Sequence, residues 1–291
     1  MASYSIKELE RLSGIKAHTI RIWEKRYAIL KPNRTDTNIR YYGDTELKRL
    51  LNIVILNNFG IKISKISKLS DEEMNDKVRE LSAESSSPGN SIENLIIAMV
   101  EMNEFKFDKI LSRYIMYEGF ENAVVNVMFP FFEQIGILWQ TGKINPVHEH
   151  FVSNLFRQKL IVAIDNLTVT DSKNVEKVVL FLPEGEYHEL ALLFYSYLMK
   201  KAGRLIYYLG CSVPFSDLEQ VVEMTEPDYM FLSTTSSLNT NIKSYINKIA
   251  KKFPNQIIGV TGLQVQNKDI KAPQNVIKVS SPADMSKFLK S

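Results

Sequence analysis

Hydrophobic and polar positions follow different rhythms in the two parts of the chain. In two helices that follow residue 5, and then from residue 92 to about residue 170, apolar residues recur every three or four positions, which is the spacing of one face of a helix. After residue 174, short β-branched or aromatic runs alternate with helical segments, and these runs are 178–182, 205–209, 229–233, 257–260 and 276–279. The pattern predicts a multidomain chain with an α-helical first part and an α/β second part that contains a doubly wound parallel sheet.

The segment 5–42 has the order of signals of a winged helix-turn-helix. Ser5 and Glu8 have the spacing of a capping box, and the helix that they start is broken at Gly14. A second helix follows, and turn residues around strand-like pieces in 33–42 predict a β-wing. Two helices joined by a short turn that contains Gly present the second helix to a DNA major groove. The expected apolar face of this second helix consists of Ala17, Ile20, Ile22 and Trp23.

Basic and polar side chains on the second helix and the wing are the expected DNA contacts. They are His18, Thr19, Arg21, Lys25 and Arg26 on the helix, and Arg34, Arg40 and Tyr41 in the wing. Residues 1–69 carry 14 Lys and Arg against 6 Asp and Glu, whereas the remaining residues carry 22 against 27. An excess of basic residues in the first 69 positions, followed by an excess of acidic residues, is typical of a protein whose N-terminal domain binds phosphates. A helical domain with solvated Lys and Arg side chains would give the same counts.

Four segments are predicted. Residues 1–75 form the DNA-binding domain, called the reader below, residues 76–91 form a linker, residues 92–172 form a four-helix bundle and residues 175–291 form the α/β domain. The linker prediction comes from the small polar residues of 82–91, which include Pro-Gly. The bundle prediction comes from four apolar stripes, which begin at Ile92, Phe107, Val124 and Phe151.

Composition indicates a soluble cytoplasmic protein that is not an enzyme. Cys211 is the single cysteine, which excludes an internal disulfide framework and suits a reducing compartment. The start of the chain has no signal-peptide pattern, and the longest apolar run is far shorter than the roughly 20 residues of a membrane helix. No catalytic triad, zinc-type cysteine cluster or paired-carboxylate motif is recognisable, and neither GxGxxG nor a Walker A sequence is present.

The first 69 residues resemble the MerR family of DNA-binding domains in motif order. The matching pieces are TIRIWEKRY at 19–27, P-x-R at 32–34, IRYY at 39–42, a helix from residue 44, and NNFGIKISKISKL at 57–69. The resemblance implies a homo-oligomer, a dimer or a tetramer, on a pseudo-palindromic operator. It also implies that the second helix lies in the major groove and that the wing lies on the backbone.

The loop after the first strand resembles the D/E-x-H-x-x-G signature of cobalamin-binding domains. It contains Glu186-x-His188, and the next strand ends in LGCSVP at 209–214. A His in such a loop is, taken alone, more often an ordinary hydrogen-bonded residue. The resemblance implies a cobalamin cofactor with His188 as the lower ligand of cobalt and Glu186 on the other ring nitrogen. It also implies that Ser233, Thr235 and Gly262 line the buried nucleotide tail.

A second match lies in the predicted bundle. Trp139, nine further residues and then Glu149-His150 reproduce the W-x9-E-H pattern of light-sensing, adenosylcobalamin-binding repressors of the MerR type. The resemblance implies that the bundle caps the upper face of the corrin, with Trp139 over the adenosyl group and with Glu149 and His150 beside it. Adenosylcobalamin is therefore the expected form of the cofactor. Without this domain order, Trp139 would be read as a core aromatic and the other two residues as a solvated helix start.

Two departures from the family pattern leave alternatives open. Ala191 stands where the signature has Gly, and its methyl group would narrow a pocket for the tail. Gln140 stands where light-sensing relatives have a His, and an amide is a poor cobalt ligand. We therefore expect cobalamin binding without a bis-histidine photoproduct.

Three hypotheses follow from this sequence. The first is a regulator, expected to be a repressor, whose oligomeric state and operator binding depend on cobalamin, and for which the resemblance to light-sensing repressors leaves a light response open. The second is a MerR-type regulator in which a degenerate cobalamin domain serves protein–protein interaction or dimerisation. The third is a corrinoid methyl-transfer enzyme or its carrier subunit. The basic DNA-binding domain is evidence against it, because a methyl carrier has no use for a helix that binds a DNA groove.

Overall fold

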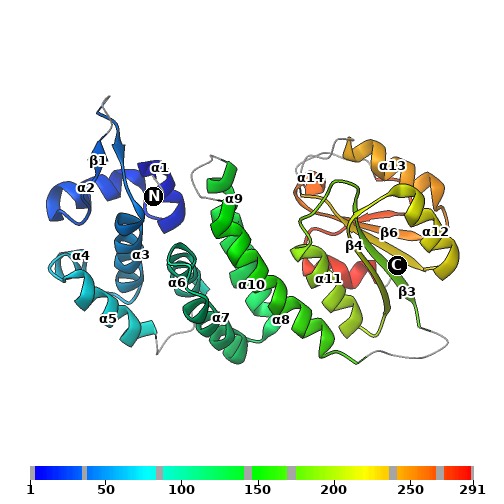
Figure 1. Ribbon diagram of the computed structural model, residues 1–291, viewed down its shortest axis with the longest axis horizontal. Helices are drawn as coiled ribbons and strands as arrows, with labels where there is room; N and C mark the ends of the chain where they lie inside the picture. Colours follow the sequence, from blue (N-terminus) through cyan, green and yellow to red (C-terminus); the bar gives the residue numbers. More distant parts are fainter. Residues whose placement is uncertain are drawn as a thin grey trace. The chain divides into compact units, whose positions relative to one another are not determined.

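The computed structural model describes residues 4–34, 38–82, 88–140, 146–168, 175–235, 241–266 and 272–289 (Figure 1). The chain divides into two compact units, 1–155 and 156–291, and the boundary falls inside helix α10 (Pro146–Asp165). Among the described helices, none combines the length and the apolar composition that crossing a membrane requires.

The reader has the predicted winged helix-turn-helix arrangement. Its elements are α1 (Ile6–Ser13), α2 (Ala17–Tyr27), β1 (Asn33–Arg34), β2 (Arg40–Tyr41) and α3 (Asp44–Asn58). The Ser5 hydroxyl accepts from the Glu8 backbone N–H, and the Glu8 carboxylate accepts from the Ser5 N–H, so the capping box is formed. Gly14 ends α1 in the left-handed conformation, with φ of 70°. The strands β1 and β2 pair antiparallel as the wing.

The expected apolar face of α2 is wrong for Ile22, whose side chain is 54% exposed, whereas Ile20 is fully buried. Two positions along an α-helix turn the side chain by about 200°, so Ile22 lies on the far side of α2 from Ile20. Ala17 and Trp23 are half-buried. The core of the reader therefore takes a narrower face of α2 than the sequence pattern indicated.

The prediction of a linker over 76–91 is wrong at both of its ends. Helix α5 (Asp71–Ser82) continues into this range, and α6 (Pro88–Val100) begins within it. Asn90 and Ser91 are buried because α6 packs against α3, where the Asn58 amide donates to the Asn90 side-chain oxygen. The reader and the first bundle helices thus form one compact unit.

The remaining helices of this unit follow the predicted apolar stripes. They are α4 (Ile63–Ile66), α7 (Glu104–Glu118), α8 (Phe120–Ala123), η1 (Val124–Met128), α9 (Phe129–Gln140) and the first part of α10. The third predicted stripe is continuous in sequence, but the helix that carries it contains a π-helical turn, η1. Met102 continues the three- and four-residue spacing of the stripe that begins at Ile92, but it is exposed because α6 ends at Val100.

The second unit contains the predicted parallel sheet. Its strands are β3 (Lys177–Pro183), β4 (Leu205–Val213), β5 (Tyr229–Ser233), β6 (Ile257–Thr261) and β7 (Val276–Lys278). All neighbours pair parallel in the order β4-β3-β5-β6-β7. Helices cover both faces of the sheet, as Figure 1 shows, so the fold is doubly wound. The strand order reverses at β3, and ligands of such sheets bind outside the carboxyl ends of the strands at this point.

Each face of the sheet has its own core. Tyr229 and Phe231 of β5 pack with residues of α11 (Leu190–Lys201) and α15 (Pro282–Phe288). Met230 and Leu232 point to the other face, which α12 (Phe215–Thr225) and α13 (Ile242–Lys252) cover. The alternation follows from the two-residue period of a strand. The short helix α14 (Leu263–Gln266) follows β6.

Candidate cofactor and DNA sites

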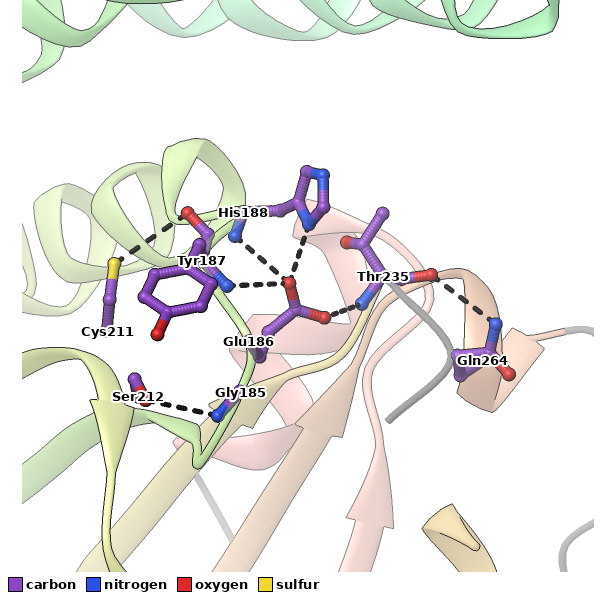
Figure 2. Close-up of polar contacts among 8 residues, drawn as sticks. All are labelled: Gly185, Glu186, Tyr187, His188, Cys211, Ser212, Thr235 and Gln264. Atoms are coloured by element: carbon purple, nitrogen blue, oxygen red, sulfur yellow. Dashed lines mark hydrogen bonds and ion pairs between the residues drawn. The ribbon is translucent and has the colours of Figure 1, made fainter. Parts of the chain in front are cut away.

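Glu186 is the centre of the loop between β3 and α11. Its carboxylate is fully buried and accepts from the backbone N–H groups of Tyr187 at 2.9 Å and of His188 at 3.0 Å on one oxygen. The other oxygen accepts from the Thr235 N–H at 2.8 Å, after β5 (Figure 2). A buried carboxylate is stable only with such partners, so Glu186 joins the ends of two neighbouring strands at the switch point.

The same carboxylate contacts the ring of His188. Nδ1 of His188 lies 2.6 Å from Oε1 of Glu186. An ionised carboxylate only accepts hydrogen bonds, so Nδ1 carries the proton in this contact and the neutral ring has its lone pair on Nε2. Figure 2 shows the ring standing above Glu186 with Nε2 directed away from the carboxylate. This carboxylate–histidine pair is the arrangement that orients an imidazole for a metal.

The end of β4 fixes the shape of this loop. Gly185 adopts φ of 82°, and its N–H donates to the Ser212 hydroxyl at 3.1 Å. The Ser212 N–H in turn donates to the Glu186 carbonyl at 3.0 Å. Burial, followed by the neighbouring Glu189 carboxylate, raises the pKa of Cys211 to about 11, so this thiol stays protonated at neutral pH. The raised pKa favours the packing role that the sequence indicated for Cys211 over a role as a nucleophile.

A second carboxylate, Glu189, follows His188 directly and was not singled out from the sequence. It accepts from Nε of Arg157 at 2.5 Å and from the Tyr208 hydroxyl at 2.9 Å. Arg157 lies on the second part of α10, and the Lys200 ammonium at the end of α11 donates to the Ile164 carbonyl of α10 at 2.9 Å. Two contacts thus hold α10 along α11. No sequence motif indicates these two contacts, because the residues that they join are 32 and 36 positions apart.

The surroundings of His188 at the strand ends are partly apolar and exposed. Tyr187 is 68% exposed and Leu263 of α14 is 49% exposed. The Gln264 amide donates to the Thr235 carbonyl at 3.4 Å, which ties α14 to the loop after β5. An exposed imidazole that follows the exposed aromatic residue Tyr187 in the chain suits a large, flat ligand that has an apolar face and a central metal.

The predicted tail residues divide into two groups. Ser233, and with it Thr234, the next residue in the chain, has a buried hydroxyl oxygen without a hydrogen-bond partner among the described residues, so both hydroxyls suit a polar ligand group. Gly262, with φ of 103°, is instead needed by the fold, because an added Cβ would lie 2.2 Å from the Thr234 carbonyl oxygen. Ala191 is half-buried in the first turn of α11. The donor set at His188 therefore fits a corrinoid, and the hydroxyls fit its polar tail.

The bundle residues of the W-x9-E-H match belong to the first unit. Trp139 lies near the end of α9, and its side chain is outside the described part of the structure, as is that of Gln140. Glu149 and His150 lie in the first turns of α10, where Nε2 of the exposed His150 ring is 3.7 Å from the Glu149 carboxylate. Their role toward a cofactor remains a prediction.

The reader presents its predicted DNA contacts to solvent. The exposed side chains are His18, Arg21, Lys25, Arg26, Arg34 and Arg40, while Thr19 and Tyr41 are half-buried. Glu24 of α2 accepts from Nε of Arg40 at 3.2 Å and from the Tyr42 hydroxyl at 2.9 Å. These bonds fasten the wing to the second helix, so that both elements present one basic surface.

Comparisons with known proteins agree with this architecture. Residues 4–73 match the model of the MerR HTH family regulatory protein, and residues 91–163 match that of the B12 binding domain. The chain is thus a DNA-binding transcription regulator that combines a MerR-type helix-turn-helix with a B12-binding domain.

Two transcriptional repressors are similar to this chain over most of their length. The HTH-type transcriptional repressor CarH of Myxococcus xanthus is 27% identical over 241 residues, which are 81% of this chain and 80% of CarH. The repressor CarA of the same organism is 24% identical over 230 residues, which are 78% of this chain and 75% of CarA. The monomethylamine corrinoid protein of Methanosarcina barkeri has a similar fold, with a TM-score of 0.53 and 13% identity over 70% of this chain and 98% of that one.

Proposed function

We propose that this chain is a transcriptional repressor whose operator binding is controlled by a cobalamin ligated through His188. The observation that carries the proposal is the contact between Nδ1 of His188 and the buried carboxylate of Glu186 at the switch point of the sheet. The similarity to the repressors CarH and CarA supports repression, and the match to a B12 binding domain supports the cofactor. A bound corrinoid would supply a cobalt centre with exchangeable axial ligands.

Regulation through this site is a linkage effect. A ligand changes operator occupancy only to the extent that it favours one state of the protein over another. Two readers joined through their sensors bind two half-sites with a high effective concentration. We propose that adenosylcobalamin favours a homo-oligomer of this kind, with Trp139, Glu149 and His150 contacting the upper ligand. Since Gln140 replaces a His, we expect no bis-imidazole species after illumination.

The alternative is a regulator that has lost the cofactor and uses its domains for dimerisation. One observation favours it: the space over Gly259 of β6 is filled by two aromatic rings, those of Phe231 and Phe288. A corrin-binding measurement distinguishes the two functions directly.

The test is an absorption spectrum after dark incubation with adenosylcobalamin, followed by gel filtration. We expect a corrin band that co-elutes with the wild-type protein. Ligation by His188 is tested separately with cob(II)inamide, which has no base of its own, so that an axial nitrogen in its electron paramagnetic resonance spectrum must come from the protein. His188→Ala should abolish this nitrogen signal, and His18→Ala in the reader is the matched control that should keep it. A wild-type protein peak without corrin would support the cofactor-independent regulator.

A further inference from the structure

A complete cobalamin needs a ligand to cobalt and also space for its nucleotide, and His188 supplies only the ligand. In a complete cobalamin a nucleotide is attached to the face of the corrin that His188 would ligate. When an imidazole of the protein takes the lower position, this nucleotide leaves the cobalt and has to be accommodated near the strand ends, where His188 lies. The inference below rests on the proposed function and concerns where the nucleotide finds room.

The sheet has one packed layer on each face, and the buried Ser233 hydroxyl, which suits a polar group of the nucleotide, lies in one of these two layers. Ser233 follows Tyr229 and Phe231 at two-residue spacing, so it faces α11 and α15. Its hydroxyl oxygen is buried and has no hydrogen-bond partner among the described residues. Thr261, which is paired with Ser233 on β6, is also a buried hydroxyl residue. This layer therefore has a polar rim.

Directly below this rim the layer is filled. Gly259 is paired with Phe231, and a Cβ built on Gly259 would lie 2.5 Å from a Phe231 ring carbon and 2.9 Å from a Phe288 ring carbon. Both rings are fully buried, with centroids 5.7 Å apart, and Tyr195 contacts Phe231 at 4.9 Å. As it stands, the layer has no room over Gly259 for a nucleotide base.

Of these rings, Phe288 is the one that the fold can release at least cost. Phe231 belongs to a central strand and Tyr195 to the 12-residue helix α11, so moving either would disturb the sheet or a long helix. Phe288 is the last residue of α15, which has seven residues and follows β7 at the edge of the sheet. The opposite face is closed by two helices of 11 residues each.

We infer that Phe288 is a plug, which a complete cobalamin displaces and a corrinoid without the nucleotide leaves in place. The site therefore discriminates between corrinoids by their lower nucleotide. Exposing one buried Phe ring lowers affinity by a factor of roughly 10 to 100. The Ser233 hydroxyl gains its missing partner from an oxygen of the nucleotide once the ring has left.

The experiment compares cobinamide, which lacks the nucleotide, with cobalamin in titrations of the full chain followed by absorption. Wild-type protein should bind cobinamide about 10-fold more tightly than cobalamin. Phe288→Ala should tighten cobalamin binding about 10-fold and leave cobinamide binding within roughly twofold. Phe253→Ala, which removes a buried ring from the opposite face, is the matched control and should leave the ratio of the two affinities unchanged.

Equal affinities of wild type for both corrinoids, with no change in Phe288→Ala, would overturn the plug while leaving the proposed function intact. Failure of the wild type to bind either corrinoid would overturn both. Hydrogen exchange of the wild-type backbone over 282–288 gives a readout that needs no variant. Cobalamin should accelerate this exchange and cobinamide should not; slower or unchanged exchange with bound cobalamin counts against displacement.

Discussion

The loop after β3 and the middle of helix α6 each contain a carboxylate with a buried oxygen, and the consequences for stability are opposite. Glu186 in the loop accepts from three backbone N–H groups and contacts the His188 ring. Glu93 in α6 has one oxygen, Oε2, that is buried without a hydrogen-bond partner among the described residues, and burial raises its pKa to about 7. A partnered buried charge organises a site, whereas an unpartnered one costs stability.

The largest effect is expected from Glu186→Ala. The substitution removes the common acceptor of the Tyr187, His188 and Thr235 N–H groups, so it should lower the unfolding free energy of the second unit by about 3 kcal/mol. Hydrogen exchange of the β3 and β5 amides measures this loss. Glu184→Ala, at an exposed position of the same loop, is the control and should change stability by less than about 0.5 kcal/mol. Equal protection in both variants would refute the role of Glu186 as the hub of the loop.

Glu93 should make the first unit less stable as the pH rises. Its pKa is raised on folding, so its folded state holds a proton that the unfolded state releases between about pH 4.5 and pH 7. Stability falls across this window, and Glu93→Gln should therefore be more stable than wild type by about 2 kcal/mol at pH 8, with little difference at pH 4. Urea unfolding followed by tryptophan fluorescence reports on this unit, since Trp23 and Trp139 both belong to it.

Glu101, which follows α6, provides a control of opposite sign. Its ion pairs with Lys48 at 2.9 Å and Lys106 at 3.2 Å outweigh burial and lower its pKa. The stability that it contributes is present above its unfolded pKa and is lost as the pH falls. Glu101→Gln should thus be slightly destabilising at pH 8. If Glu93→Gln also destabilises at pH 8, the comparison between the two buried carboxylates fails.

Local patterns predicted most of the elements, and long-range packing accounts for most of what was missed. The capping box of Ser5 and the apolar run 229–233 act within a few residues, so the sequence indicated them correctly. The burial of Asn90 depends on α3, more than 30 residues away, so small polar residues there looked like a linker. The filling of the space over Gly259 depends in the same way on Phe288.

The candidate site shows the same division. The spacing of Glu186 and His188 was readable because two residues of one loop make the contact. The contact between the Thr235 backbone N–H and Glu186 was not readable from the sequence, because the two residues are 49 positions apart. The role of Glu189 was not predictable from local sequence, because its partners Arg157 and Tyr208 lie on α10 and β4.

The contribution of Glu189 to stability should lie between those of Glu186 and Glu93, since Glu189 has hydrogen-bond partners but one of them is exposed. Arg157 is about half exposed, so Arg157→Ala should cost only about 1 kcal/mol, with Tyr208 still donating to Glu189. The loss should appear as faster hydrogen exchange in the second part of α10. Gln158→Ala, at the neighbouring exposed position, is the control. Identical exchange in both variants would show that the ion pair does not hold α10.

The smallest effect is expected where charge is fully exposed, on the reader. Arg21 of α2 lies at the surface, so Arg21→Ala should leave stability unchanged but weaken binding to duplex DNA roughly fivefold. Because each phosphate contact releases counterions, the slope of log affinity against log salt should fall by about 1. Fluorescence anisotropy with random-sequence duplex at several salt concentrations measures both quantities, and Arg113→Ala on α7 is the control outside the reader. An unchanged slope in Arg21→Ala would mean that Arg21 does not contact phosphate, and the reader would then bind DNA through the other basic residues of α2 and the wing.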